Sequence, residues 1–158
     1  MSALAGRLAV VSGASRGIGL EVARARAAEG MRVVMLARSA DVRAARGAEI
    51  GAGAVAMPCD VADADGVRRV ADRVTSQSGG APPDVIVNNA GTFTLSTIEA
   101  MAPRDFRAAL DVNLAAPFVL VHAFLSAMRA RGSGHVVTIG SIADRMTFPE
   151  NGAYAASK

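Results

Sequence analysis

Tyr154 and Lys158 are the residues whose types and spacing most directly suggest chemistry. The chain has 158 residues with a single tyrosine, and Lys158 is the one lysine among 17 basic residues. Four positions separate the two, so on a helix they share a face, one turn apart. A phenol titrates near ~10 in water, and a neighbouring ammonium group lowers that value. The pair is therefore a candidate for giving a proton to a substrate oxygen or for taking one from it.

A glycine-rich segment, Ser12–Gly19, joins an apolar run to a helix-like segment. Its glycines Gly13, Gly17 and Gly19 have the spacing G-x-x-x-G-x-G, which differs from G-x-G-x-x-G. Glycine lets the backbone approach a pyrophosphate, and the start of a helix offers free N–H groups and a positive potential. A glycine loop alone is a weak signal, but between a buried strand and a helix it indicates dinucleotide binding.

Short apolar runs alternate with helix-like segments along the whole chain, as is typical of a parallel sheet covered on both faces. We expect one domain, residues 1–158, with an α/β doubly wound (Rossmann) fold and strand order 3-2-1-4-5-6. Five strands are present, and we expect that a C-terminal part with the sixth is missing. The predicted strands are 8–11, 32–36, 54–57, 84–87 and 135–139; the predicted helices are 17–29, 40–50, one around 67–74 capped by Asp63 or Asp65, and a long one from Pro103 to Arg131.

Polar residues follow the predicted strands at the edge where such sheets bind ligands, the carboxyl ends of the strands. Loops are polar in most proteins, so no single one of these residues is informative. Their joint arrangement on one edge predicts a binding site. The residues are Arg38 after the second strand, Asp60 and Val61 after the third, Asn88–Gly91 after the fourth and Ser141 after the fifth.

Together these motifs resemble the classical branch of the short-chain dehydrogenase/reductase family, and in particular its NADPH-dependent 3-oxoacyl-carrier-protein reductases. The match runs from about Leu8 to Lys158, with Ser12 where threonine is common. The resemblance implies hydride transfer between NADP(H) and a small carbonyl or alcohol substrate. It implies Tyr154 as general acid and base, tuned by Lys158, and Ser141 as a hydrogen-bond donor to the substrate oxygen. The implied catalytic set is Asn113, Ser141, Tyr154 and Lys158, and the implied cofactor-binding set is Ser12, Gly13, Ser15, Arg16, Gly17, Ile18, Gly19, Arg38, Asp60, Val61, Asn89, Ala90, Gly91, Tyr154 and Lys158.

Arg16 and Arg38 predict a preference for NADP(H) over NAD(H). An NAD site usually has an acidic residue about 20 positions beyond the glycine loop, and here that position holds Ala37-Arg38. A guanidinium group can pair with a 2′-phosphate through charged, bidentate hydrogen bonds. Each arginine alone is equally consistent with a solvated surface charge. Asp60 resembles the family residue that contacts the adenine, and it is also consistent with a helix cap.

Asn113 lies within the predicted long helix, where asparagine is intrinsically unfavourable. Pro117 follows four positions later and removes the N–H that would bond to the carbonyl of Asn113. We therefore expect a kink there and a free carbonyl at Asn113. The resemblance implies that this residue helps to hold a water molecule in a proton relay.

Composition excludes several other classes of protein. The net charge of +3 is modest, the basic residues are scattered and aromatics are only 4%, so nucleic-acid binding is not expected. No apolar run approaches the ~20 residues of a membrane span. Neither His122 nor His135 has partners at metal-ligand spacing, so no metal site is expected. Cys59 is the only cysteine, which fits a reducing compartment, and we expect a cytoplasmic protein.

Two further expectations concern the assembly and an alternative function. The long helix is apolar on more than one face, and the resemblance implies pairing through it as a homo-oligomer, a dimer or tetramer. Burial against the missing C-terminal part is the alternative explanation of its apolar faces. Its apolar residues Phe106, Leu110, Leu114, Phe118, Val121, Leu125 and Met128 fall on one side. A sensor or scaffold that binds NADP(H) without turnover is the alternative; the early end of the chain favours it and the complete Asn-Ser-Tyr-Lys set argues against it. Lys158 is expected to begin a helix.

Overall fold

Five parallel strands form one sheet in the order β3-β2-β1-β4-β5, which confirms the predicted doubly wound arrangement. The computed structural model describes residues 2–38, 50, 53–146 and 148–158, so the predicted helix 40–50 lies outside the described residues except for Ile50. Within those ranges the strands are β1 (Leu8–Ser12), β2 (Arg32–Ala37), β3 (Ala54–Pro58), β4 (Val85–Asn88) and β5 (His135–Thr138), and the helices are α1 (Gly17–Ala28), α3 (Ala64–Gln77), α4 (Pro103–Leu110), α5 (Ala116–Arg131) and α6 (Gly152–Ser157), with a π-helical segment η1 (Asp111–Ala115) and a 3₁₀ helix η2 (Ile142–Asp144).

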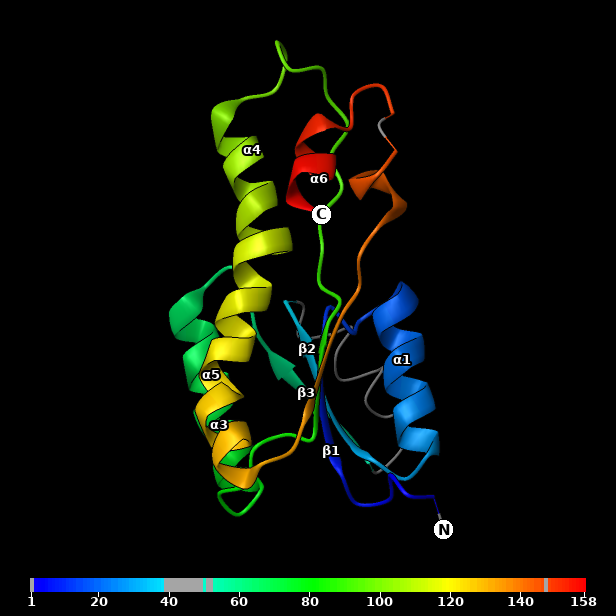
Figure 1. The fold of residues 1–158 in the computed structure, drawn as a ribbon, viewed down its shortest axis with the longest axis vertical. Helices are drawn as coiled ribbons and strands as arrows, with labels where there is room; N and C mark the ends of the chain where they lie inside the picture. Colours follow the sequence, from blue (N-terminus) through cyan, green and yellow to red (C-terminus); the bar gives the residue numbers. More distant parts are fainter. Residues whose placement is uncertain (1, 39–49, 51–52, 147) are drawn as a thin grey trace.

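The central strand β1 is buried along its whole length because helices cover both faces of the sheet. In Figure 1, α1 lies on one side of the sheet, and α3 and α5 lie on the other. Side chains of a strand alternate between the two faces. Val10 accordingly packs in the layer with α3 and α5, while Ala9 and Val11 pack in the layer with α1. This double cover is the reason that the strands are continuous apolar runs rather than alternating ones.

Helix α3 begins at the predicted aspartate and buries the predicted face. The carboxylate of Asp63 accepts the backbone N–H of Asp65 at 3.0 Å, which makes Asp63 rather than Asp65 the N-cap. Val67, Val70 and Val74 are buried against the sheet, as their helical spacing predicts.

The long helix runs from Pro103 to Arg131 and contains one widened, π-helical turn, η1, between α4 and α5. In η1 the N–H of Ala116 bonds to the carbonyl of Asp111, five residues back. Pro117, which follows, has no N–H with which to continue the regular ladder. The break that Pro117 imposes is therefore absorbed as a π-helical turn, a feature that often lies at functional sites. Asn113 lies at the centre of this turn and is buried.

The long helix turns a different face to the core from the one with the most conspicuous apolar stripe. Leu120 and Phe124, which lie outside that stripe, are buried, while Phe118 is 70% and Leu114 is 60% exposed; Met128 is the one residue of the stripe that is buried. Because the helix is apolar on more than one face, periodicity alone does not decide which face packs inward. The small residues Ala109 and Ala116 are buried on the packed face, where they let the helix approach its neighbours closely.

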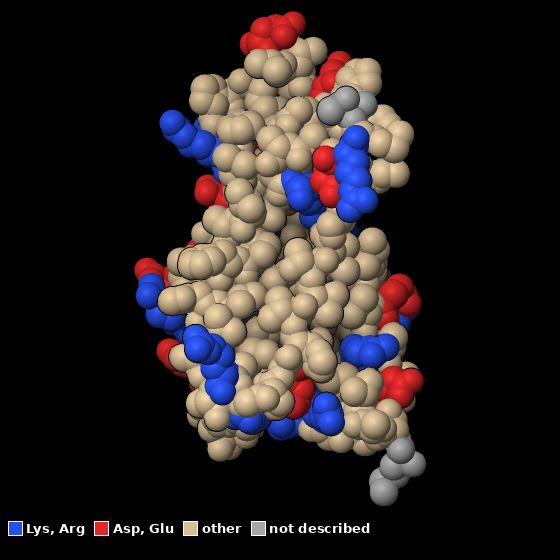
Figure 2. Space-filling model, in the orientation of Figure 1, with Lys and Arg blue, Asp and Glu red and all other residues tan. Residues whose placement is uncertain are grey.

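Among the described residues, the helix Pro103–Arg131 alone has the length and apolar composition of a membrane span, contrary to the expectation that none would. Core helices of globular proteins meet the same criteria, and this helix packs Leu120 and Phe124 into the core. Figure 2 shows acidic and basic side chains interspersed along the edges and ends of the visible face, without a basic stripe.

The last part of the chain forms a separate layer beyond the sheet. All four residues of β5 are exposed, since this strand is at the edge of the sheet. The chain then passes through η2 to α6, which lies beside α4 (Figure 1). The expectation that Lys158 begins a helix is wrong: α6 begins at Gly152, already contains Tyr154, and ends before Lys158.

Candidate functional site

The glycine loop is held to the loop after β4 by a buried serine and an asparagine amide. The Ser12 hydroxyl accepts the backbone N–H groups of Asn89 and Ala90, each at 3.0 Å, and donates to the carbonyl of Val87 at 3.3 Å. In return, the Asn89 side-chain amide donates to the carbonyls of Ser12 at 3.0 Å and Gly13 at 3.2 Å. The hydroxyl of Ser12 is thus used entirely within the protein, where it fixes the two loops relative to each other.

Two glycines of the loop are required by backbone geometry and by close contact. Gly13 has a φ of +65°, and a Cβ there would come within 2.7 Å of the Ala90 Cα. A Cβ on Gly19 would overlap the Asn89 amide and come within 2.6 Å of the Gly13 carbonyl oxygen. These glycines therefore allow the glycine loop and the β4 loop to come into contact.

The start of α1 has the free groups that an anionic ligand needs. Its N-cap residue Arg16 makes no side-chain capping bond, and no acidic residue occupies the first turn. The first N–H groups of α1 and its positive end are therefore available for a phosphate. A Cβ on Gly17 would meet no atom within 4 Å, so the space in front of the helix is open.

A pocket of about 480 Å³ opens at this carboxyl edge of the sheet. Arg16 and Arg38 lie on its wall and are both exposed, and their guanidinium groups make no ion pair or hydrogen bond with any residue that the structure describes. Two unpaired guanidinium groups beside an open helix start fit a ligand that carries several phosphates, such as NADP(H). The lining residues are Gly13, Ser15, Arg16, Gly17, Leu36, Ala37, Arg38, Cys59, Asp60, Val61, Asn89, Ala90, Gly91, Thr92, Ala108 and Val112.

Ten of the residues expected to bind the cofactor line this pocket, and five do not. Ser12 and Gly19 lie beneath the loop, and Ile18 is 61% exposed on α1. Tyr154 and Lys158 belong to the layer beyond the sheet. Asp60 accepts the N–H of Ala62 at 3.1 Å and does not cap α3, so its capping alternative is not what the structure shows.

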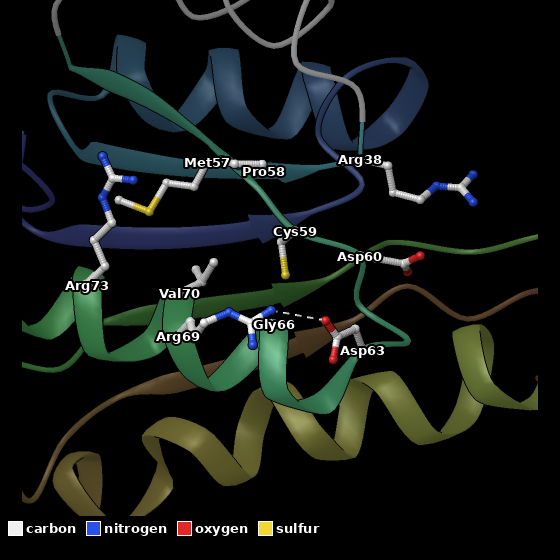
Figure 3. A pocket seen from close by; sticks show the side chains of 10 residues that line it. All are labelled: Arg38, Met57, Pro58, Cys59, Asp60, Asp63, Gly66, Arg69, Val70 and Arg73. Atoms are coloured by element: carbon white, nitrogen blue, oxygen red, sulfur yellow. Dashed lines mark hydrogen bonds and ion pairs between the residues drawn. The ribbon is translucent and has the colours of Figure 1, made fainter.

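A second hollow of about 400 Å³ lies between β3 and α3 and shares Arg38, Cys59 and Asp60 with the first (Figure 3). Burial, with the nearby carboxylates of Asp60 and Asp63, raises the pKa of the Cys59 thiol to about 11. Cys59 is therefore a neutral, buried thiol. The hydrogen bond from the Gly66 N–H and the guanidinium of Arg69, 3.2 Å away, hold the pKa of the Asp63 carboxyl below its usual range.

Tyr154 and Lys158 lie together at the end of β5. The Lys158 ammonium donates to the carbonyl of Ile139, the residue after β5, at 3.1 Å, and lies 5.8 Å from the centroid of the Tyr154 ring. The lysine is thus anchored to the sheet, and the tyrosine lies one helical turn before it. Gly91, which lines the pocket, lies close to this lysine: a Cβ on Gly91 would be 3.8 Å from Lys158 Nζ.

Phe93 packs against the tyrosine and was not predicted from the sequence. Its ring lies edge-on to Tyr154, with 4.7 Å between centroids and an interplanar angle of 88°. The ring is also 60% exposed. No local pattern marks Phe93, because its partner is far away in the sequence.

The Asn113 side chain links the π-helical turn to two other segments. Its amide forms a pair of bonds with Thr92, accepting the N–H at 2.8 Å and donating to the carbonyl at 2.9 Å. It also donates to the hydroxyl of Ser157 at 2.8 Å. Thr92 and Ser157 were likewise not predicted.

Ser141 lies at the start of η2, half-buried, and its hydroxyl accepts the N–H of Ala143 at 3.2 Å. As η2 packs against α6, the structure brings Ser141 to the end of the molecule that holds Tyr154. The hydroxyl hydrogen of Ser141 has no recorded acceptor in the described part of the chain, so it remains free to donate to a ligand.

Comparison with known proteins agrees with this geometry. The sequence profile described as short chain dehydrogenase matches residues 7–158. The chain belongs to this family.

Similar proteins act on different substrates. The chain is 38% identical to a 3-oxoacyl-[acyl-carrier-protein] reductase from Synechocystis, over 100% of this chain and 65% of that protein. It is 34% identical to a D-threitol dehydrogenase from Mycolicibacterium smegmatis, over 98% of this chain and 60% of that protein. A metagenomic short-chain oxidoreductase, solved in complex with NADP, superposes with a TM-score of 0.94 at 39% identity, over 99% of this chain and 72% of that one. The chain spans about half to two thirds of the length of the curated relatives that it matches.

Proposed function

We propose that this protein is an NADP(H)-dependent oxidoreductase that interconverts a small carbonyl compound and its alcohol. The observation that carries the proposal is the anchoring of Lys158 to Ile139, which fixes a tyrosine–lysine pair at the end of the sheet where the dinucleotide pocket opens. A chain that only binds a nucleotide has no need of a tyrosine and lysine fixed in this way.

The cofactor is assigned to the pocket at the carboxyl edge of the sheet. The start of α1 receives the pyrophosphate, and Arg16 and Arg38 receive the 2′-phosphate. Support for NADP(H) comes from the two guanidinium groups, which have no partner among the described residues, and from the NADP complex of the similar metagenomic enzyme. When bound, NADPH supplies the hydride for carbonyl reduction.

The catalytic work of the chain is to move one proton and to hold the substrate oxygen. The Tyr154 hydroxyl gives its proton to the carbonyl oxygen in reduction and takes it back in oxidation. The ammonium of Lys158 favours the phenolate that forms on Tyr154. Ser141 donates a hydrogen bond to the same oxygen and stabilises its developing charge. The carbonyl of Asn113 holds a water molecule through which the proton is replaced.

We further propose that the protein is a cytoplasmic homo-oligomer that pairs through the exposed apolar face of the long helix. Leu114, Phe118 and Leu125 form this face and are all exposed in the chain by itself. Exposed apolar patches of this kind mark interaction surfaces. The buried free thiol of Cys59 fits a reducing compartment.

The proposal is tested by steady-state oxidation of NADPH with a panel of ketones, 3-oxoacyl thioesters and sugars. Tyr154→Phe keeps the ring and removes only the hydroxyl. It is expected to retain NADPH binding and to lower kcat by about 10²–10⁴-fold. Lys158→Arg keeps the charge but not the shape of the head group, and we expect it to lower kcat as well. Near-full kcat in Tyr154→Phe would refute the mechanism.

A further inference from the structure

Ser157 lies between two residues of the catalytic set and contacts both. It is only 3% exposed. Its hydroxyl accepts a hydrogen bond from the Asn113 amide at 2.8 Å and donates one to the backbone carbonyl of Tyr154, also at 2.8 Å. A hydroxyl has one hydrogen to donate and can accept at the same time. Ser157 uses both capacities, one toward each catalytic residue.

The contact with Ser157 completes the bonding of the Asn113 amide. The amide nitrogen has two hydrogens, of which one goes to the carbonyl of Thr92 and the other to Ser157. The amide oxygen accepts from the N–H of Thr92. A reversed amide would place its nitrogen against the N–H of Thr92 and its oxygen against the carbonyl of Thr92, so these partners fit only one orientation of the amide. The π-helical turn, the loop after β4 and α6 are thereby joined at one point.

Helix α6 carries Tyr154 and leads directly to Lys158. It lies beside α4, the first part of the long helix that contains Asn113. At the end of α6, the described side-chain hydrogen bonds to other segments are the Ser157–Asn113 bond and the Lys158 bond to Ile139, and the Tyr154 ring contacts Phe93. The first of these bonds joins α6 to the π-helical turn, three residues beyond Tyr154.

We propose that Ser157 is a positioning residue, whose hydroxyl couples Asn113 to the Tyr154–Lys158 helix and holds the phenol and the ammonium in register. The catalytic consequence rests on the proposed function, but the positioning does not. A small apolar residue would fill the same space without joining the two helices. The hydroxyl, rather than the volume, is therefore the property that the position requires.

The chain itself offers a direct measurement, because Tyr154 is the only tyrosine and there is no tryptophan. The ultraviolet absorbance of phenolate therefore reports the ionisation of Tyr154 alone, with or without turnover. Ser157→Ala removes the hydroxyl, and Ser157→Thr retains it. Ser78→Ala is the matched control: its hydroxyl also donates to a helix carbonyl, that of Val74 at 2.7 Å, but on α3 and away from the site.

We expect Ser157→Ala to displace the phenolate absorbance titration of the folded chain, because the ammonium is no longer held in register with the phenol. Ser157→Thr restores the original titration, and Ser78→Ala leaves it unchanged. In an active enzyme, Ser157→Ala lowers kcat by about tenfold to 100-fold with an unchanged Kd for NADPH. Circular dichroism at each pH establishes that the chain is folded. If Ser157→Ala does not fold, Ser157→Cys keeps the volume, weakens both hydrogen bonds and is titrated in its place.

A purely structural serine gives a different result. If Ser157→Ala lowers the free energy of unfolding but leaves the phenolate titration of the folded chain unchanged, the proposal is overturned. The proposal is also overturned if Ser78→Ala displaces the phenolate titration as much as Ser157→Ala does. Failure of the proposed function is a separate outcome: the unmodified protein then reduces no carbonyl compound, while the phenolate titrations still decide the role of Ser157.

Discussion

The Asn89 side-chain amide donates to the carbonyl of Ser12 over 3.0 Å, while the backbone N–H of Asn89 donates to the hydroxyl of Ser12, also over 3.0 Å. The two residues are 77 positions apart and bond reciprocally. This pairing joins the ends of β1 and β4, the two strands from which the cofactor pocket opens. It places the glycine loop by contacts within the protein, before any ligand is bound.

Ser12→Ala is expected to weaken both the fold and cofactor binding. The N–H groups of Asn89 and Ala90 lose their shared acceptor, and an unsatisfied buried donor costs about 1–3 kcal/mol. Urea unfolding measures the loss in stability, and NADPH titration measures the loss in affinity. Ser12→Thr keeps the hydroxyl and is expected to preserve both. Ser76→Ala, at an exposed position of α3, is the control. Equal stability of Ser12→Ala and Ser76→Ala would contradict the prediction.

Arg38→Asp is expected to reverse the cofactor preference from NADPH to NADH. The guanidinium group has no described partner, so its removal breaks no internal contact, while a carboxylate repels the 2′-phosphate and accepts from a ribose hydroxyl. A charge-assisted hydrogen bond is worth roughly 1.5–3 kcal/mol, which is at least about tenfold in affinity. Fluorescence titration with both cofactors checks this. Arg73→Asp, in the neighbouring hollow only, is the control, and equal affinity of the unmodified protein for both cofactors would refute the assignment.

Cys59 is expected to make stability fall at alkaline pH. Burial raises the pKa of its thiol to about 11 in the folded chain, above the ~8.5 of an unfolded cysteine. Between these values the unfolded chain binds fewer protons than the folded one, so the free energy of unfolding decreases as the pH rises. Below ~8.5 the contribution is fully present, and it is lost as the pH rises to about 11. The free energy of unfolding, measured with urea, should therefore decline more steeply over this pH range for the unmodified protein than for Cys59→Ala. Parallel declines would show that the thiol does not ionise on unfolding.

Two phenylalanines on the same helix are expected to behave oppositely. Phe124 is 2% exposed in the core, so Phe124→Ala should lower the free energy of unfolding by about 3–5 kcal/mol. Phe118 is exposed and its described ring contact is with His122, with 5.7 Å between ring centroids, so Phe118→Asp should leave the monomer folded. It should instead abolish self-association, as measured by light scattering. An unmodified protein that is monomeric at all concentrations would rule out pairing through this face.

Sequence alone determined the sheet, its strand order and the chemical types at its edge. Continuous apolar runs such as Leu8–Val11 have no stable place except a sheet covered on both sides, and the chain order then limits the topology. The glycine loop and the spacing of Tyr154 and Lys158 are local patterns, since the residues involved lie within one or two turns of each other. Local patterns can be predicted because no distant partner is needed to define them.

Only the tertiary structure decided which face of the long helix is buried, how Pro117 is accommodated and which distant residues meet. The helix is apolar on more than one face, so its inward face depends on the shape of the sheet and of α3. Phe93 meets Tyr154, and Asn113 meets Ser157 across 44 positions, because the layer of α4 and α6 folds back over the end of the sheet. Hydrogen bonds of this kind follow from how whole elements pack, and no sequence spacing encodes them. The same is true of the bonds by which the buried hydroxyl of Ser12 joins two loops of the protein.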